Sequence, residues 1–445
     1  VNGPGSLRAS VEKTGEDTVL FQIARMMEMA QGTKAPVASI ADRVAAVFVP
    51  TVIAIALFCF VGWTLAGRDP QFALTISISV LVISCPCALG LATPLAIVMG
   101  TGKGSQHGIL YKTASSLEAA ARVDTVILDK TGTCTVGSPE VDSFTTVMDE
   151  REFLSLVASA EYDSEHPLGE AVVRHAEKIG IPVREHSGFE SVTGGGVRCT
   201  VDGRSVFVGN AGLLEENNIV IPEGSWDVSD GRTVVFVSVD GVFAGTISIS
   251  DPVREESPSA VSSLSNDGIR VMMVTGDRRS TAEAIASELG IPEVRSETKP
   301  ADKLDIVKKL QIAQKRVAMV GDGINDAPAL TQADVGIAVG SGTDIAMESA
   351  DIVLMNDDLR SVPAALEIGR ATLINIKQNL FFAFVYNIIC IPIAAGLPVV
   401  FGFDGLVAQM PMISAAAMSL SSISVVSNAL RLGRFEPEAL RGSRT

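Results

Sequence analysis

Long apolar stretches alternate with polar sequence along the chain, and four of them contain no Asp, Glu, Lys or Arg. These stretches are Val44–Ala66, Gln71–Gly102, Gln378–Phe403 and Gly405–Leu430. Each exceeds the ~20 residues that a helix needs to cross about 30 Å of hydrocarbon, whereas buried core helices are usually shorter. Because only short links join them, at Gly67–Pro70 and around Asp404, the pattern predicts two transmembrane hairpins.

Basic residues flank these stretches mainly on one side. That side carries Lys34, Arg43, Lys103, Lys112, Arg370, Lys377, Arg431 and Arg434, whereas the opposite links carry only Arg68, Asp69 and Asp404. Cytoplasmic flanks of membrane spans are enriched in Lys and Arg. We therefore expect a multi-pass protein of the cell membrane whose large polar block and both termini are cytoplasmic. The first residues are polar, so we expect no cleavable leader.

The polar block between the hairpins begins and ends with an α/β pattern. Three apolar, β-branched runs, Val123–Asp129, Arg270–Asp277 and Arg316–Asp322, each end at an aspartate. Helical patterns such as Ser280–Leu289 and Ala301–Lys315 alternate with these strands. Apolar strands that alternate with helices predict a parallel, doubly wound, Rossmann-like sheet. In such sheets the chemistry lies beyond the carboxyl ends of the strands, where these aspartates fall.

A different pattern separates the first of these strands from the others. Asp202-Gly203 joins Val197–Val201 to Ser205–Val208, and Asp240-Gly241 joins Thr233–Val239 to Val242–Ile249. Asp-Gly between alternating strands is a hairpin signal. We therefore predict an antiparallel α+β domain inserted into the α/β domain.

Composition narrows the class of protein. The chain has 445 residues, a formal net charge of −16, 47% hydrophobic residues, six cysteines and a mean hydropathy of +0.35. At about 150 residues per domain, this length predicts about three units. The apolar content and scattered cysteines exclude disorder, collagen and a disulfide scaffold. Net acidity without a Lys/Arg-rich run argues against a nucleic-acid partner.

The strand ends carry residues suited to phosphoryl transfer. Asp129 precedes Lys130-Thr131-Gly132-Thr133, where a carboxylate could attack phosphorus and free N–H groups could hold the phosphoryl oxygens. Thr275-Gly276-Asp277 offers a hydroxyl and an amide, and Lys303 on the next helix offers a positive charge. Asp322 could bind Mg²⁺ together with Asp129, because this hard ion prefers oxygen ligands.

Here the chain resembles the P-type ATPases. Asp129–Thr133, Thr275–Asp277 and Gly321–Leu330 are similar to the phosphorylation, TGD and GDGxNDxPAL signatures of that family, whose phosphorylation domain is haloacid-dehalogenase-like. The resemblance implies that ATP phosphorylates Asp129. It also implies that Asp129, Asp322 and the Thr131 carbonyl hold Mg²⁺, that Lys303, Thr275 and Asn325 contact the phosphoryl group, and that Asp326 supports the loop. Cys134 stands where the family usually has Leu, and we expect only a packing change.

The inserted domain resembles the nucleotide site of the heavy-metal branch of this family. The resemblance rests on Glu161, His166-Pro167, Gly194-Gly195-Gly196 and Asn210, in that order. It implies that Glu161 and His166 meet the adenine of ATP, and that Gly194, Gly196 and Asn210 belong to the same site, where glycines allow close approach of the backbone.

The membrane stretches carry candidate ligands for a soft ion. Cys85-Pro86-Cys87 lies in the second stretch, and two cysteines at i and i+2 of an unbroken helix would point about 200° apart. Pro86 disturbs the turn, so both sulfurs could converge on one ion. Thiolates favour soft ions, and a cytosol-loaded path disfavours a disulfide. The triplet resembles the heavy-metal mark of the family.

The last two stretches resemble those of the copper(I) branch. Tyr386-Asn387 lies in the third, and Met418, Ser421 and Ser422 share one helix face in the fourth. The resemblance implies Cu⁺ ligands at Cys85, Cys87, Tyr386, Asn387, Met418 and Ser421. An exporter of zinc or cadmium would be expected to carry an acidic residue in the last span and a lysine in the third, and both stretches are free of charge. Polar residues that only join helices are the alternative.

The resemblance also divides the chain. We expect the end of an actuator domain at 1–17, a linker helix and two spans at 18–103, the phosphorylation domain at 104–139 and 250–368, the nucleotide-binding domain at 140–249, two spans at 369–432 and a cytoplasmic tail at 433–445. Thr14-Gly15-Glu16 directly precedes a helical pattern and is not expected to be the dephosphorylation loop. We expect that loop and the earlier spans to be missing, and turnover by this chain alone to be poor.

Together these expectations predict an ATP-driven copper(I) exporter in a lipid bilayer. We expect ATP and Mg²⁺ as its cofactors, and a cytosolic copper chaperone or thiol as the donor of Cu⁺. Silver or a divalent metal is the alternative cargo. A haloacid-dehalogenase-type phosphatase and a non-transporting copper-binding membrane protein are alternatives of other classes. The four apolar stretches and the inserted domain count against the phosphatase, and Asp129, Lys303 and Asp322 count against the non-transporting protein.

Overall fold

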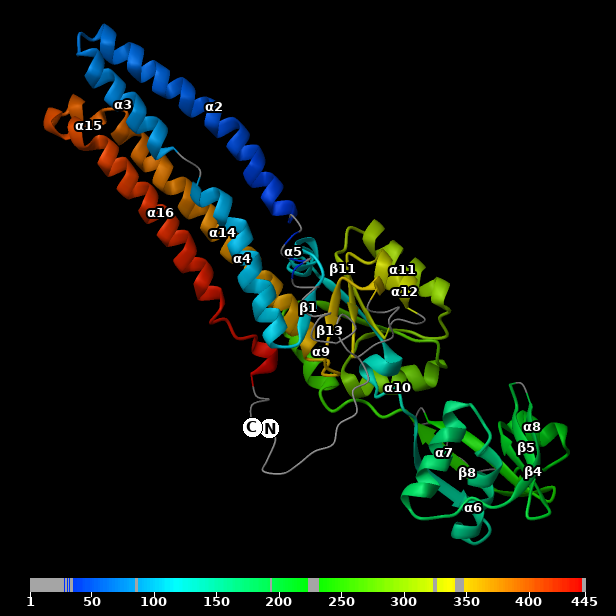
Figure 1. Cartoon of the computed structure of the whole chain (residues 1–445). Helices are drawn as coiled ribbons and strands as arrows, with labels where there is room; N and C mark the ends of the chain where they lie inside the picture. The colour runs from blue at the N-terminus through cyan, green and yellow to red at the C-terminus, as the bar shows by residue number, and fades with distance from the viewer. Residues whose placement is uncertain are drawn as a thin grey trace, which may run out of the picture.

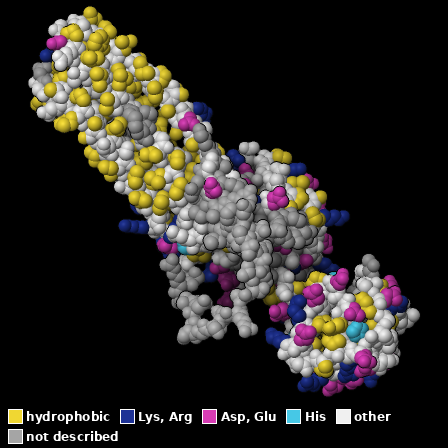
Figure 2. Space-filling view, viewed as in Figure 1, with side chains coloured by type: hydrophobic (Ala, Val, Ile, Leu, Met, Phe, Trp, Pro, Cys, Tyr) yellow, Lys and Arg dark blue, Asp and Glu magenta, His cyan; other side chains and the backbone are white. Residues whose placement is uncertain are grey.

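The computed structural model describes residues 28, 30, 32, 35–84, 87–192, 194–222, 232–322, 326–340 and 348–441. A bundle of long helices lies at one end, an α/β domain in the centre and a smaller domain at the far end (Figure 1). Apolar side chains cover the visible face of the bundle, while charged side chains gather over the other two domains (Figure 2).

Four helical segments of the bundle are long and apolar enough to cross a membrane. They comprise α2 (Pro36–Leu65), α3 (Pro70–Ile83) with α4 (Cys87–Gln106), α14 (Ser361–Ala394) and α16 (Met410–Leu432). Short helices α15 (Leu397–Val400) and η3 (Asp404–Gln409) connect the last two. The predicted spans are confirmed, and the second is divided between two helices on either side of Cys85-Pro86, which lie outside the described residues.

The central domain is built on a seven-stranded sheet in the order β1-β13-β12-β11-β2-β9-β10. Its strands are β1 (Ile109–Tyr111), β2 (Thr125–Asp129), β9 (Arg270–Val274), β10 (Glu293–Arg295), β11 (Val317–Gly321), β12 (Val335–Ala338) and β13 (Ile352–Leu354). All neighbours pair in parallel except the edge strand β1. The predicted parallel sheet is therefore confirmed.

Helices cover both faces of this sheet, which explains why its strands are apolar on both sides. Val126, Leu128 and Met273 pack on one face with α5 (Ala114–Ala120), α9 (Ser257–Asn266) and α10 (Arg279–Leu289). Ile127 and Met319 pack on the other face with α11 (Pro300–Ile312) and α12 (Ala327–Gln332).

The smaller domain is the predicted antiparallel insertion. Its six strands, in the order β3-β8-β7-β6-β5-β4, are β3 (Glu140–Thr146), β4 (His186–Val192), β5 (Gly196–Val201), β6 (Arg204–Gly209), β7 (Thr233–Val239) and β8 (Val242–Ser250). Its helices are α6 (Glu150–Glu161), α7 (Pro167–Lys178) and α8 (Ala211–Glu216). Asp202, Gly203, Asp240 and Gly241 all have positive φ, between 50° and 80°, as two-residue hairpin turns require.

Candidate functional site

The site is centred on Asp129, the last residue of the central strand β2. Strand pairing aligns Asp129 with Val274 of β9 and Leu128 with Val320 of β11, so the loops that follow all three strands leave the same sheet edge. The Asp129 side chain is only 8% exposed there. The prediction that these strand ends converge on one edge agrees with the geometry.

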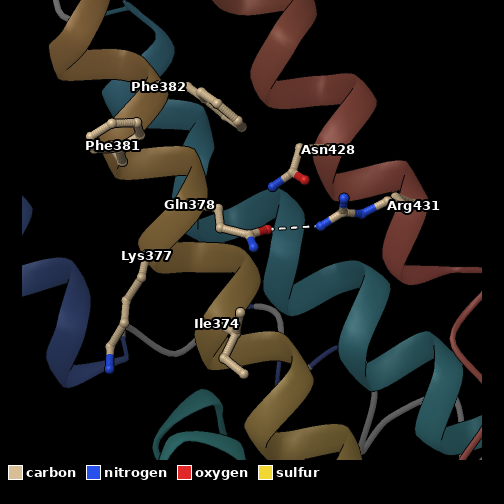
Figure 3. A pocket seen from close by; sticks show the side chains of 7 residues that line it. All are labelled: Ile374, Lys377, Gln378, Phe381, Phe382, Asn428 and Arg431. Atoms are coloured by element: carbon tan, nitrogen blue, oxygen red, sulfur yellow. Dashed lines mark hydrogen bonds between the residues drawn. The ribbon is translucent and has the colours of Figure 1, made fainter.

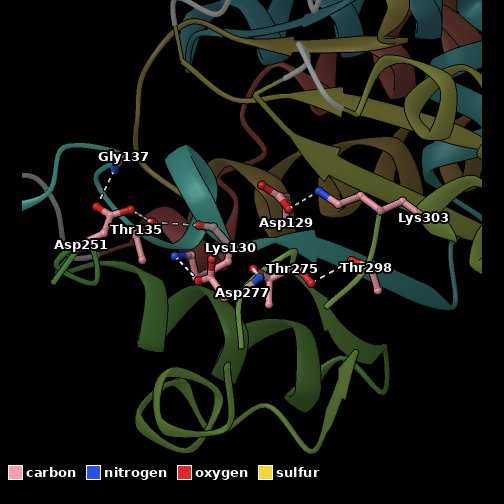
Figure 4. A network of polar contacts seen from close by, with 9 residues as sticks. All are labelled: Asp129, Lys130, Thr135, Gly137, Asp251, Thr275, Asp277, Thr298 and Lys303. Carbon is pink, nitrogen blue, oxygen red and sulfur yellow. Dashed lines mark hydrogen bonds and ion pairs between the residues drawn. The ribbon is translucent and has the colours of Figure 1, made fainter. Parts of the chain in front are cut away.

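Lys303 of α11 joins two carboxylates at this edge. Its Nζ lies 2.6 Å from Asp129 Oδ1 and 2.7 Å from Asp326 Oδ1, and all three side chains are buried. Figure 4 shows the Lys303 side chain extended toward Asp129. A single lysine therefore neutralises part of a cluster with more negative than positive charge.

This imbalance changes proton affinities. Burial, and next the charge of Asp326, raise the pKa of Asp129 to about 7, although Lys303 opposes the change. Burial lowers the pKa of Lys303, but the carboxylates of Asp129 and Asp326 outweigh burial and raise it overall. Asp129 is thus a carboxylate whose ionised form depends on nearby positive charge.

The loop after Asp129 is held in one conformation. Gly132 has φ 70°, which favours glycine, and a Cβ built on it would lie 3.1 Å from Oδ2 of Asp322, so the absence of a side chain also eases the close approach of that carboxylate. Arg254 donates hydrogen bonds to the carbonyls of Gly132 and Thr135. Asp251 accepts hydrogen bonds from Gly137 N and Thr135 Oγ1 (Figure 4).

The loop after β9 lies against the same centre. Thr275 is buried, and its Oγ1 accepts a hydrogen bond of 3.1 Å from Asp277 N. Asp277 forms an ion pair with Lys130 (Figure 4), which connects this loop to the one that follows Asp129. Thr298 Oγ1 donates a hydrogen bond to the carbonyl of Thr275 and so holds the first residue of this loop. Gly276 lies between the two side chains that make these contacts.

The oxygen-rich character of this edge fits a divalent cation. Asp322, which follows β11, lies beside Gly132 of the loop that follows Asp129, and the Thr131 carbonyl belongs to that same loop. Oδ2 of Asp326 is buried without a hydrogen-bond partner within the described residues. No group of three His, Cys, Asp or Glu side chains forms a metal site in the part of the chain that the structure describes. The expected Mg²⁺ set has only two carboxylates, Asp129 and Asp322, with one carbonyl. Asn325 lies outside the described residues.

The predicted nucleotide residues all lie in the inserted domain, where their contacts form two groups, one at the junction of α6 and α7 and one around β5, β6 and α8. Glu161 ends α6 with a buried carboxylate, and burial raises its pKa to about 7 against a hydrogen bond from Ser164. His166 is exposed and caps α7 by accepting a hydrogen bond of 3.2 Å from Leu168 N. Asn210 caps α8 and donates to the Gly194 carbonyl.

Strand packing accounts for one of the two glycines. A Cβ on Gly196 would lie 2.1 Å from the carbonyl oxygen of Val208, so the β5–β6 contact itself excludes a side chain. Gly194 has φ 73° and open space around its Cβ position. Of the two, Gly194 is the one whose surroundings leave room for a ligand.

In the bundle, the predicted ion ligands on α14 and α16 differ in exposure. Asn387 and Ser421 are buried, while Tyr386 and Met418 are half-buried. The hydroxyl of Tyr386 lies 3.1 Å from Oγ of Ser424, one turn beyond Ser421. Cys85 lies outside the described residues, as does the side chain of Cys87.

Sequence reasoning missed an asparagine network in the same bundle. Asn379 Nδ2 donates to the carbonyl of Ala92 on α4 at 3.2 Å, and Asn428 Nδ2 donates to Asn379 Oδ1 at 2.8 Å. Asn375 Nδ2 donates to the Asn428 carbonyl at 2.8 Å. The network joins α4, α14 and α16. The only signal in the sequence was polar amides inside or beside charge-free stretches.

Arg254 and Asp251 were also missed. Both follow the inserted domain, more than 110 residues after the loop that they contact. The signal was the segment Asp251-Pro252-Val253-Arg254 at the point where the chain returns from one domain to the other.

Comparison with known proteins agrees with this geometry. Residues 123–334 match the haloacid dehalogenase-like hydrolase family. Over 95% of its length the chain is similar to the crystal structure of a zinc-transporting PIB-type ATPase in an E2.Pi state, at 33% identity and a TM-score of 0.76, and it covers 68% of that chain. The chain belongs to the PIB-type ATPases.

Two relatives of this PIB-type ATPase are similar over nearly the whole chain. Copper-transporting ATPase 2 of Rhizobium meliloti is 45% identical over 98% of the chain, which covers 53% of that protein. A silver exporting P-type ATPase of Salmonella typhimurium is 46% identical over 97% of the chain, which again covers 53% of it. The chain thus spans about half the length of the curated relatives it matches. The chain is that of a multi-pass membrane protein with a cytoplasmic catalytic domain.

Proposed function

We propose that the chain carries the phosphorylation, nucleotide-binding and ion-binding parts of an ATP-driven copper(I) exporter. The observation that carries this proposal is the buried Asp129–Lys303–Asp326 cluster at the carboxyl edge of the sheet. A phosphatase of the same sheet architecture would need neither the inserted domain nor four spans, and both are present here.

The first chemical step is transfer of the terminal phosphoryl group of ATP to Asp129. A carboxylate oxygen of Asp129 forms the new bond to phosphorus, while the bond to the bridging oxygen of ADP breaks and ADP leaves with that electron pair. Lys303 and the hydroxyl of Thr275 stabilise negative charge on the transferred group, together with the N–H groups of the loop after Asp129. Asp326 keeps Lys303 in place from the opposite side.

Asp322, Asp129 and the Thr131 carbonyl would hold Mg²⁺. When bound, this ion supplies positive charge that offsets the phosphate oxygens and the excess of carboxylates. Asp129 needs such charge, since its pKa of about 7 disfavours the ionised nucleophile.

ATP would reach Asp129 from the inserted domain. The buried Glu161 and the exposed His166 flank the start of α7, and Gly194 with Asn210 forms a second polar edge of the same domain. We assign the adenine to this region and the phosphates to the loops around Asp129. Lys130, Gly276 and Asp277 then order the loops on which the phosphates rest.

Copper(I) is the cargo that the bundle favours. Cys85, Cys87 and Met418 would supply soft sulfur, and Tyr386 and Asn387 on α14 and Ser421 on α16 would supply further ligands. The apolar runs 378–403 and 405–430 contain no carboxylate to balance a divalent ion.

Moving a cation out against an inside-negative potential costs about 2.3 kcal/mol per 100 mV, so coupling to phosphorylation is required. A cytosolic thiol or chaperone would deliver Cu⁺. Silver is the second candidate, because the Salmonella relative is a silver exporter and Ag⁺ is equally soft.

The test is phosphorylation from ³²P-labelled ATP in the presence of Cu⁺, Ag⁺ or Zn²⁺. We expect Cu⁺ or Ag⁺, but not Zn²⁺, to stimulate labelling of the wild-type chain. Asp129→Asn should abolish labelling, and Cys85→Ser should abolish its dependence on metal. Labelling that survives Asp129→Asn, or that responds only to Zn²⁺, contradicts the proposal.

A further inference from the structure

A groove on the outer side of the bundle lies between α14 and α16, close to the cytoplasmic domains. It has a volume of about 390 Å³ and is lined by Ile374, Lys377, Gln378, Phe381, Phe382, Asn428 and Arg431. This volume falls within the range of about 300–1,000 Å³ that small ligands occupy. Figure 3 shows Gln378, Phe382, Asn428 and Arg431 between the two helices, with Lys377 and Phe381 on the adjoining outer side of α14.

The groove lies where the apolar surface of the bundle ends. Lys377 directly precedes the charge-free run 378–403, and Arg431 directly follows the run 405–430. The two residues are therefore the first charges that the two helices present on the cytoplasmic side. In a membrane this level is the boundary between hydrocarbon and headgroups.

Both cations are available to a ligand. Among the residues that the structure describes, neither Lys377 nor Arg431 has a carboxylate partner, whereas the nearby Arg370 pairs with Asp267. Arg431 donates one hydrogen bond of 2.9 Å to Oε1 of Gln378, which orients its guanidinium across the groove (Figure 3). Its other N–H groups and the amide of Gln378 are donors for an anionic group.

The apolar side chains lie on the other side of the cations. Phe381 is 62% exposed, one turn further into the membrane than Lys377, and Phe382 lines the groove beside it. Figure 3 shows the Lys377 side chain extended toward the Ile374 end of the helix and away from both rings. A cation that reaches toward the headgroups while aromatic rings remain at the hydrocarbon level is the arrangement expected at a membrane surface.

We propose that this groove binds one anionic phospholipid of the cytoplasmic leaflet. The lipid phosphate accepts hydrogen bonds from Arg431, Lys377 and the Gln378 amide, and an acyl chain lies against Phe381 and Phe382. Charge complementarity selects this occupant, because a zwitterionic lipid places its own cation beside Lys377 and Arg431. The proposal is independent of the transported ion and of phosphorylation at Asp129.

The first test uses tryptophan fluorescence in the Phe381→Trp chain, reconstituted in lipid bilayers. Phosphatidylglycerol or phosphatidylcholine with brominated acyl chains quenches a tryptophan that it contacts, and the parent chain with Trp63 and Trp226 gives the background. We expect roughly tenfold preferential quenching by phosphatidylglycerol. Adding Lys377→Gln and Arg431→Gln should reduce the preference to about one.

The matched control is Arg434→Gln, an exposed cation on the same side of the membrane but outside the groove, which should leave the preference intact. Excess inorganic phosphate should not displace the lipid, because a free phosphate ion has no acyl chain to pack against Phe381 and Phe382. Equal quenching by both lipids, a preference that survives the double substitution, loss of preference in Arg434→Gln, or displacement by inorganic phosphate overturns the proposal.

A second measurement needs no new tryptophan. Native mass spectrometry of the chain released from mixed bilayers should show one retained phosphatidylglycerol more on the parent than on the Lys377→Gln, Arg431→Gln variant. Equal retention on both overturns the proposal.

Discussion

The carboxylate of Glu118 accepts a hydrogen bond of 2.8 Å from the backbone N–H of Val37. Glu118 lies on α5 of the central domain, and Val37 is the second residue of α2, the first span that the structure describes. The first N–H groups of a helix have no partner within it, and a negative charge there is favourable. The contact therefore attaches the start of α2 to the domain that carries Asp129, so motion of that domain would move the span.

Replacing Glu118 by Ala should loosen this attachment. The side chain is buried, and hydrogen bonds to charged groups contribute about 1.5–3 kcal/mol. We expect amide exchange at the start of α2 to rise by roughly tenfold or more, while exchange in the core strand β2 stays unchanged. Glu118→Gln keeps an acceptor and should show a smaller effect. Equal exchange in all three chains contradicts a coupling role.

Replacing Lys303 by Met should strongly slow phosphorylation of Asp129. Without this cation, Asp129 and Asp326 lose their shared partner, and the pKa of Asp129 should rise further above about 7, which leaves less ionised nucleophile at neutral pH. We expect the phosphorylation rate to fall by about 100-fold or more, with binding of a non-hydrolysable ATP analogue nearly unchanged. Lys309→Met, on the exposed side of the same helix, is the control. Comparable rates for the two variants would show that Lys303 does not act on the phosphoryl group.

The two glycines of the inserted domain should respond differently to alanine. Gly196→Ala places a Cβ against the Val208 carbonyl and should destabilise this domain by at least about 2 kcal/mol. Gly194→Ala meets open space and should cost only about 1 kcal/mol for its positive φ. If Gly194 approaches the nucleotide, its substitution should weaken binding of the ATP analogue while the domain stays folded. Thermal melting and equilibrium binding measure the two effects separately.

Glu161 should make the stability of the inserted domain depend on pH. Burial raises its pKa from 4.5 to about 7, so the folded state holds a proton that the unfolded state releases. The stabilisation is complete below about pH 4.5 and is lost as the pH rises through 7, by on the order of 3 kcal/mol. Amide exchange of α6, corrected for intrinsic rates, should report this loss between pH 5 and 8. Glu161→Gln should remove the dependence, and an unchanged profile in that variant would assign it to another group.

Much of the fold was predictable because the strongest signals in the sequence are local. Charge-free runs as long as 378–403 specify membrane helices, and the apolar run that ends at Asp129 specifies a strand buried on both faces. Parallel strands end at the same sheet edge, so the convergence of Asp129 with the loop of Thr275 and with Asp322 followed from topology.

Contacts between distant segments were not predictable in this way. Glu118 and Val37 are 81 residues apart, and neither residue type nor spacing marks them as partners. The asparagine network depends on the relative rotation of α4, α14 and α16, which apolar periodicity leaves open. For Gly196 the sequence suggested a role that the structure does not require. The resemblance assigned this glycine to the nucleotide site, whereas the packing of β5 against β6 already excludes a side chain there.

The central claim is that an ion bound in the bundle controls formation of an acyl phosphate on Asp129. The most direct measurement maps the phosphorylated peptide after brief exposure to labelled ATP, with Cu⁺ or with a Cu⁺ chelator. We predict acid-stable, hydroxylamine-sensitive label on the peptide that contains Asp129, present with Cu⁺ and absent with the chelator. Label on another peptide, or equal label on Asp129 under both conditions, would contradict the account.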